Sequence, residues 1–320
     1  RESHTRKKKK MKKYKGEGWT LYHGNCLDVC KKSPDNYFSN ITTDPPYCLQ
    51  SIAKRFGKKG SAAAKHGKDG AFGRLSKNFL EQSWDDDIVF KVSTWKEFYR
   101  IIKPGGIVLS FAADQNYHKM ATAAENAGFK IKRIIGWLYG TGMVHGLDIE
   151  KVMAKKGRKA GKYKGYGTAL KPAIEPIMVA IKPLSEKTIL ENLDKWGTAG
   201  IYNIAKCRIP DHKKPKYPTN IIHDGSDCIA SNGNFIPSYF YCPKPSKKEK
   251  GDSLHPTKKP LALMRYLIRL TTPPGGKIFE PFAGSGTTMQ AAIEEGFKVV
   301  GCEMTSKYIP EIRKRLKNAK

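Results

Sequence analysis

Residues 43 to 47 of the 320-residue chain read Thr-Asp-Pro-Pro-Tyr and follow an apolar stretch that is typical of a strand. Asp44 supplies carboxylate oxygens, and the carbonyl of Pro45 adds an acceptor on a backbone whose φ is fixed by the ring. Pro46 stiffens the turn further, and Tyr47 offers a flat aromatic face beside the acceptors. The set suits a planar group that carries an NH2, such as adenine or cytosine. The alternative is an ordinary turn, because Asp-Pro often opens turns.

A second set of residues, 279–288, reads FEPFAGSGTT and lies between a strand-like and a helix-like stretch. Glycines there let the backbone pass close to a ligand, and a helix N-terminus favours an anionic group. Glu303 ends the next strand-like stretch, where an acid in a βαβ unit reaches ribose hydroxyls. No P-loop lysine follows the glycines, and Met289 stands where a dinucleotide site has its third glycine. The pattern indicates a nucleoside site, with a tight strand-to-helix turn as the alternative.

The elements that would position these two sets alternate between strand and helix. Strands are expected at 19–23, 37–43, 107–113, 129–139, 177–181, 277–280 and 297–304, and helices from about 26, at 88–102, 115–127, 188–196, 260–272 and 287–296. This alternation is typical of a mostly parallel, doubly wound α/β sheet.

Composition indicates a polyanionic partner. The formal net charge is +30, from 59 Lys and Arg against 29 Asp and Glu. Residues 1–13 carry +7 of this, so the remainder still carries +23. DNA or RNA is favoured over a membrane, because no long apolar stretch accompanies the charge.

The seven cysteines form no Cys-x-x-Cys pair, and the eight histidines are scattered. We therefore expect free thiols, no metal site and a reducing cytoplasm. The N-terminus has no apolar segment of a signal peptide.

An amino-group site and a nucleoside site in one α/β chain point to methyl transfer from S-adenosylmethionine. Together, TDPPY and FEPFAGSGTT resemble the motifs of the amino-methyltransferases that modify exocyclic amines of DNA. Their order along the chain resembles the β class of that family, and the resemblance runs from about residue 20. HPTKKP at 255–260, KPGG at 103–106, and GTALKPAIEP with GTAGIYNI in the middle resemble phage and bacterial members.

The resemblance implies a Rossmann-like, circularly permuted methyltransferase fold with an inserted target-recognition region. It implies S-adenosylmethionine as the cofactor and double-stranded DNA as the partner, with no metal and no membrane, and it leaves a homodimer open. The implied catalytic residues are Asp44, Pro45, Pro46 and Tyr47, and the implied cofactor contacts are Asn25, Cys26, Asp44, Lys259, Glu280, Phe282, Ala283, Gly284, Ser285, Gly286, Thr287 and Glu303. Two of these depart from the family pattern, because Glu280 and Asn25 stand where Asp is usual.

The implied reaction acts on a base flipped out of the duplex, with Tyr47 stacked on it and Asp44 accepting from its amine. Adenine N6 is the preferred target over cytosine N4, because members acting on cytosine N4 more often carry Ser at position 44. An RNA or protein amine methyltransferase is a rival interpretation, and so is a non-catalytic DNA-binding module.

The expected organisation has four parts. Residues 1–13 are a basic, disordered tail, or an extension before Met11, and 14–139 are the catalytic part with a lid or mobile loop at 48–83. Residues 140–250 are the target-recognition and DNA-binding region, and 251–320 the cofactor-binding part. Lys151, Lys155, Lys156, Arg158 and Lys159 form a basic cluster that faces phosphates or solvent. A prokaryotic or phage-encoded, cytoplasmic modification enzyme is expected, with or without a restriction partner.

Overall fold

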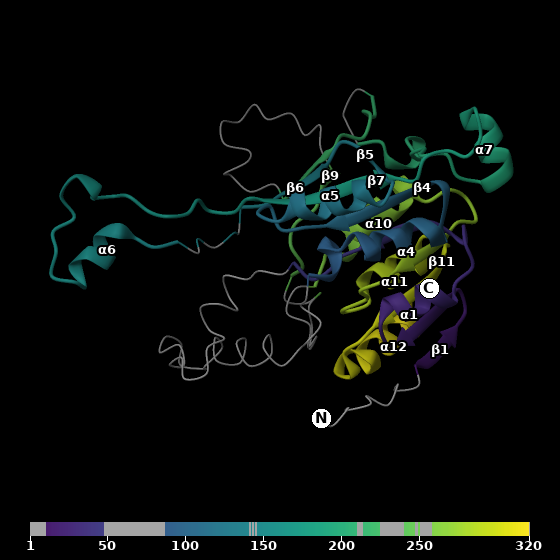
Figure 1. The fold of residues 1–320 in the computed structure, drawn as a ribbon, viewed down its shortest axis with the longest axis horizontal. Coiled ribbons are helices and arrows are strands. Elements are labelled where there is room, and N and C mark those ends of the chain that lie inside the picture. Colours follow the sequence, from purple (N-terminus) through teal and green to yellow (C-terminus); the bar gives the residue numbers. More distant parts are fainter. Residues whose placement is uncertain are drawn as a thin grey trace, which may run out of the picture.

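The computed structural model describes residues 11–47, 87–140, 142, 144, 146–209, 214–224, 240–246, 249 and 258–319. Within them, one sheet carries eleven strands with helices packed on it (Figure 1). Its path runs β1-β2-β11-β10-β3-β4-β7-β6-β8-β9, and β5 pairs with β7 beside it. The strands are β1 (Lys12–Gly16), β2 (Trp19–His23), β3 (Phe38–Thr43), β4 (Ile102–Phe111), β5 (Lys130–Ile131), β6 (Ile135–Leu138), β7 (Ile174–Ile181), β8 (Ile221–His223), β9 (Phe240–Tyr241), β10 (Lys277–Glu280) and β11 (Lys298–Glu303).

Five central strands, β2, β11, β10, β3 and β4, are parallel, whereas β7 joins β4 in the antiparallel sense. Strands β10 and β11 come from the C-terminal end of the chain, yet they lie between β2 and β3 from the N-terminal end. The predicted permutation is therefore confirmed, because the sheet is assembled from both ends of the sequence.

Helices cover both faces of this sheet, as predicted. One face packs against α1 (Cys26–Lys32), α4 (Val92–Ile101) and α5 (Tyr117–Asn126), and the other against α10 (Leu261–Thr271), α11 (Thr287–Glu294) and α12 (Ile309–Asn318). Neighbouring residues of one strand point to opposite faces, so Ile278 packs with the second set of helices and Phe279 with the first.

One predicted boundary is wrong. Lys12 and Lys13 belong to β1, which pairs antiparallel with β2, so the tail predicted at 1–13 does not extend to residue 13. An edge strand tolerates lysines because one side of it faces water. The region predicted at 140–250 contributes β7 to the central sheet beside β4, and its role in target recognition stays a prediction. The predicted loop at 48–83 lies outside the described residues.

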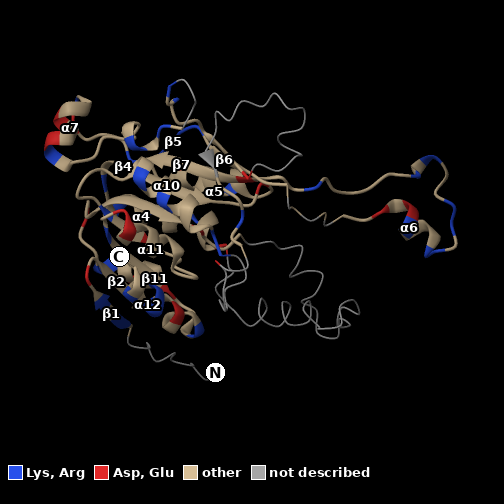
Figure 2. Cartoon of the chain, turned by 180° about the vertical axis from the view of Figure 1, so that it is seen from behind, with Lys and Arg blue, Asp and Glu red and all other residues tan. Residues whose placement is uncertain are grey.

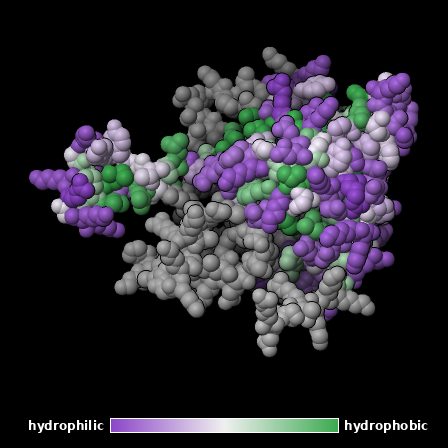
Figure 3. Space-filling model, viewed as in Figure 1, coloured by the Kyte–Doolittle hydropathy of each residue, from purple (hydrophilic) through white to green (hydrophobic). Residues whose placement is uncertain are grey.

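A projecting arm, residues 146–171, leaves the sheet between β6 and β7 and carries α6 (Ile149–Ala154) at its end (Figure 1). Backbone hydrogen bonds from Ile149 to Tyr166 and from Thr168 to Leu147 close it as a hairpin. Lys and Arg gather along it (Figure 2), and hydrophilic and apolar side chains lie next to each other on its surface (Figure 3). In the described part of the chain, no helix is both long and apolar enough to cross a membrane.

Candidate active site

The two sequence motifs meet where β3 and β10 end. These strands are parallel neighbours, with Ile41 opposite Phe279, so their carboxyl ends lie at the same edge. The hydroxyl of Thr43 donates to Oε1 of Glu280 over 2.5 Å and joins the two motifs directly. The next described long helix after β3, α4, packs on one face of the sheet, and α11, which follows β10, packs on the other. Such a switch point opens a crevice for a ligand.

Glu280 is 1% exposed and holds this junction together. Its Oε1 also accepts from the backbone N–H of Phe282 over 3.0 Å. Burial raises the pKa of Glu280 to about 8, while hydrogen bonds from the Thr43 and Thr288 hydroxyls act in the opposite sense. A carboxyl group with that pKa is mostly protonated at pH 7. The main role of Glu280 is therefore that of an uncharged carboxyl group whose hydrogen bonds link β3 to β10.

The glycine-rich turn and the end of β11 form the second wall. Gly284 and Gly286 have φ of +53° and +79°, in the left-handed region that glycine adopts without strain. Glu303 accepts from the backbone N–H of Gly284 over 2.9 Å and from that of Thr305 over 2.6 Å. Burial raises the pKa of Glu303, and these N–H groups oppose the rise. The carboxylate is thus fixed against the turn, with acceptor capacity left for hydroxyl groups.

Asp44 lies in a compact ionic cluster with Tyr47, Glu175 and Lys259. The Lys259 ammonium is 2.7 Å from Asp44 Oδ2, 2.7 Å from Glu175 Oε1 and 3.1 Å from the Tyr47 hydroxyl. The Tyr47 hydroxyl is also 2.8 Å from Asp44 Oδ1 and contacts Glu175 Oε1. A hydroxyl has one hydrogen, so Tyr47 donates to one carboxylate at a time, whereas the ammonium has a hydrogen for each of its three partners.

Burial and charge act against each other in this cluster. Burial raises the pKa of Asp44, while the Lys259 cation lowers it and the Glu175 carboxylate adds to the rise. Burial also acts to lower the pKa of Lys259, but Asp44 and Glu175 outweigh it and raise that pKa overall. The cation therefore stays charged, and it counteracts the tendency of Asp44 to take up a proton.

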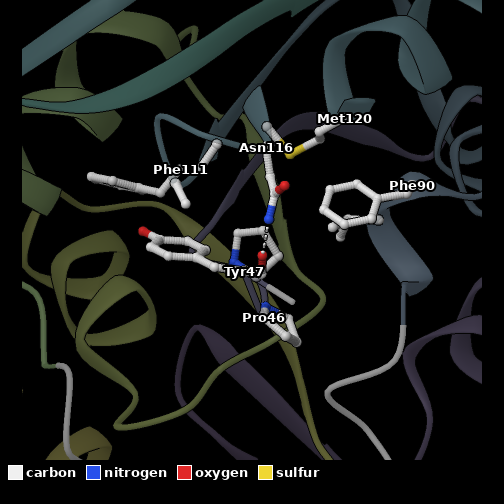
Figure 4. A pocket seen from close by; sticks show the side chains of 10 residues that line it. Pro46, Tyr47, Phe90, Phe111, Asn116 and Met120 are labelled. Atoms are coloured by element: carbon white, nitrogen blue, oxygen red, sulfur yellow. Dashed lines mark hydrogen bonds between the residues drawn. The ribbon is translucent and has the colours of Figure 1, made fainter. Parts of the chain in front are cut away.

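An apolar pocket adjoins the cluster, between the Asp-Pro-Pro-Tyr turn and α5 (Figure 4). Pro46, Tyr47, Phe90, Phe111 and Met120 are among the residues that line it. The side-chain amide of Asn116 donates to the Tyr47 carbonyl over 2.9 Å and so fixes the end of the turn. Tyr47 is therefore held by hydrogen bonds at both its backbone carbonyl and its side-chain hydroxyl.

Other residues predicted for the site have different places. Asn25 caps α1, accepting from the N–H of Leu27 over 2.9 Å, and the Cys26 side chain is 3% exposed within the core. The predicted cofactor contacts of Asn25 and Cys26 stay predictions, and burial of the Cys26 side chain leaves its backbone as the part that could make one. Ala283, Ser285 and Thr287 are buried around the glycine-rich turn, and Phe282 is partly buried there. Lys259 forms an ion pair with Asp44, and its predicted cofactor contact stays a prediction.

Sequence reasoning missed two residues of this site, Glu175 and Asn116. A signal for Glu175 existed, because a lone acid opens an otherwise apolar strand, Ile174–Ile181. A charge there needs a buried partner. Asn116 gave no signal, since it lies in an ordinary polar stretch before a helix.

The comparisons with known proteins agree with this geometry. The family model described as DNA methylase matches residues 38–314. This chain belongs to that DNA methylase family. It is 28% identical over 302 residues to the type II methyltransferase M.HindIII of Haemophilus influenzae, covering 88% of this chain and 90% of the relative. It is 27% identical over 308 residues to the DNA adenine methyltransferase YhdJ of Escherichia coli, covering 95% and 84%.

A solved structure shows the same fold. The cytosine-N4-specific PvuII DNA methyltransferase superposes with a TM-score of 0.53 and 18% identity, covering 93% of this chain and 86% of that one. This DNA methyltransferase is therefore an S-adenosylmethionine-dependent enzyme with the predicted doubly wound architecture. The fold is shared by enzymes that act on either amine, so it does not select the base.

The residues present suit S-adenosylmethionine. Glu303 ends β11 with a fixed carboxylate for ribose hydroxyls, and the positive-φ glycines, whose N–H groups bond to Glu303 and to the Ala283 carbonyl, turn the backbone tightly beside the crevice. We infer that Glu303, Gly284 and Gly286 would hold the nucleoside part, next to Asp44. Within the described residues, no group of three metal-ligating side chains lies together.

Proposed function

We propose that this DNA methyltransferase methylates the N6 amine of an adenine flipped out of duplex DNA. The observation that carries the proposal is the Thr43–Glu280 hydrogen bond, because it fixes Asp44 beside the crevice with Glu303. Support for adenine comes from the carboxylate at position 44 and from the names of relatives such as YhdJ. Cytosine N4 is the second candidate, because the cytosine-N4-specific PvuII enzyme has the same fold and the fold does not select the base.

The side chains of the turn orient the acceptor amine. When bound, S-adenosylmethionine supplies an electrophilic methyl group, so a C–N bond forms, the C–S bond breaks with its electron pair on sulfur, and one amine proton is released. Asp44 and the Pro45 carbonyl accept hydrogen bonds from the amine and direct its lone pair out of the ring plane. Tyr47 stacks on the base, and its ring is pre-set by Asn116.

The DNA-binding surface extends beyond the site. We assign the arm at 146–171 to phosphate contacts, because its exposed basic residues lie on a hairpin that stands away from the sheet (Figure 2). The remaining described parts of 140–250 that lie outside β7 are candidates for base recognition. A cytoplasmic location remains a prediction.

Nucleoside mass spectrometry tests the proposal. Duplex DNA incubated with the protein and S-adenosylmethionine is expected to yield N6-methyladenine, and Asp44→Ala to yield none. Calorimetry is expected to show that Asp44→Ala still binds S-adenosylmethionine to within about tenfold of the wild type. N4-methylcytosine as the sole product would show that cytosine, not adenine, is the target base. Loss of S-adenosylmethionine binding in Asp44→Ala would contradict the role of Asp44 in holding the amine.

A further inference from the structure

Lys259 and Glu175 reach the Asp-Pro-Pro-Tyr turn from two other parts of the chain. Lys259 lies two residues before the start of α10, and Glu175 is the second residue of β7. The side chains of Lys259, Glu175 and Asp44 are 10%, 13% and 19% exposed. Solvent therefore screens their charges only weakly, and each charge acts strongly on the others.

The ammonium also lies near two aromatic rings. It is 4.7 Å from the centre of the Phe111 ring and 5.4 Å from that of Tyr47. The Lys259 ammonium thus contacts three oxygen atoms and lies near two aromatic rings. All of these groups belong to the Asp-Pro-Pro-Tyr turn or to β4 and β7, and none belongs to the glycine-rich turn.

The charges in this cluster leave a net −1 when both carboxylates are ionised. Asp44 paired with Lys259 alone would form a neutral pair. Positive charge builds on the amine nitrogen during methyl transfer, and a neutral pair stabilises that charge less than a net negative cluster does. Glu175 restores the negative charge without removing the cation. Asp44 also keeps acceptor capacity, because a carboxylate offers about four lone-pair positions and Tyr47 and Lys259 use two.

We propose that Lys259 and Glu175 are positioning residues that act as a charge-balancing pair, so that Asp44 meets the substrate amine as a carboxylate in a cluster of net charge −1. The proposal rests on the proposed function, because it gives Asp44 the amine as its ligand. Lys259 lowers the pKa of Asp44 against the rise that burial causes, and Glu175 prevents the cation from cancelling the negative charge that faces the amine.

Single-turnover rates on duplex DNA, measured with saturating S-adenosylmethionine, test the charge balance. Glu175→Gln leaves a neutral cluster, and we expect its rate to fall by about 10- to 100-fold. The double variant Glu175→Gln with Lys259→Met returns the cluster to −1, and we expect its rate to rise at least about tenfold above that of Glu175→Gln. A double variant as slow as Glu175→Gln, or slower, would overturn the proposal.

A matched control comes from a surface pair. Glu186 and Lys195 are 2.6 Å apart and lie away from the site, so Glu186→Gln removes a lysine-paired glutamate without changing the cluster. Its rate is expected to equal that of the wild type. Calorimetry of S-adenosylmethionine on all variants separates a charge effect from lost cofactor binding. A loss of S-adenosylmethionine affinity in Lys259→Met would show that Lys259 binds the cofactor and would overturn its charge-balancing role.

A second measurement needs neither cofactor nor DNA. Carbon-13 NMR of labelled aspartate carboxyl groups, assigned through Asp44→Asn, reports the pKa of Asp44. We expect that pKa to be higher in Lys259→Met than in the wild type and lower in Glu175→Gln, because the cation lowers it and the second carboxylate raises it. The other titratable groups that face the cluster are the same in every variant, namely Tyr47, Asp114, Tyr139, Lys244 and Glu280.

The two measurements separate the two proposals. A wild-type protein that methylates no base would overturn the proposed function, while the NMR titration would still decide the charge balance. Unchanged or opposite shifts of the Asp44 pKa would overturn the charge balance, whatever the protein methylates.

Discussion

Glu280 joins the two halves of the active site, and its burial makes stability depend on its protonation. Its pKa of about 8 in the folded protein lies above its ordinary value of 4.5. Between these pH values the folded state holds more protons than the unfolded state, so the free energy of unfolding falls as pH rises. Integrated over the window, the loss reaches about 5 kcal/mol at most.

Glu280→Gln should remove this dependence. The amide has nearly the same shape and no charge to desolvate, so the variant is expected to lose less stability than the wild type between pH 5 and pH 8. Urea denaturation at several pH values measures the difference. Glu17→Gln, at an exposed turn residue, is the control and should follow the wild-type curve. Parallel curves for Glu280→Gln and the wild type would show that Glu280 is ionised in the fold.

At the scale of elements, the arm at 146–171 is the part best separated from the chemistry. We expect the combined change of Lys155, Lys156, Arg158 and Lys159 to Gln to weaken duplex binding and to flatten its salt dependence. Each lost phosphate contact lowers the slope of log K against log salt by about 1, so the change is up to about 4. The turnover rate at saturating DNA should stay within about threefold of the wild type.

A control for the arm removes as many positive charges elsewhere. Lys31 and Lys32 in α1 and Lys314 and Lys317 in α12 are exposed, and their change to Gln alters the net charge by the same amount. Fluorescence anisotropy with a labelled duplex at several salt concentrations compares the two variants. An equal loss of slope in both would mean that the arm acts only through the overall charge.

Elements of the site differ in how far sequence could predict them. The strands that end at Thr43, Glu280 and Glu303 were predicted, because apolar runs ending in turn residues carry a local signal. The position of Glu175 depends on β7 pairing antiparallel with β4, a long-range contact that no local pattern encodes. Strand β1 was missed because its lysines resemble those of a charged tail, although an edge strand accommodates them.

At the scale of the whole molecule, the crevice joins strands from both ends of the chain, so cofactor binding should stabilise the entire central sheet. S-adenosylmethionine at about 100 times its dissociation constant is expected to add about 2.7 kcal/mol of stability, in a single thermal transition. Differential scanning calorimetry measures this shift, and Glu303→Ala, which loses the carboxylate for the ribose, should show a smaller one. A ligand shift confined to one of two separate transitions would contradict this coupling.

The permuted architecture itself was predictable from the resemblance, because the order of the two motifs along the chain is that of the β class. The arm was not predictable as a projecting hairpin. Its basic residues fit a solvated surface as well as a DNA-binding one, and only the backbone contacts between residues such as Ile149 and Tyr166 define its shape.

The position of β10 between β2 and β3 also sets the timing of folding during synthesis. Thr43 and Glu280 are 237 residues apart in the chain, so a ribosome adding about 5 to 20 residues per second makes Glu280 roughly 10 to 50 s after Thr43. Until then β3 has β4 on one side but lacks β10 on the other, and the Asp-Pro-Pro-Tyr turn has no cofactor site beside it. A nascent or prematurely terminated chain is therefore unable to modify DNA, and the enzyme becomes active only when almost its whole length has left the ribosome.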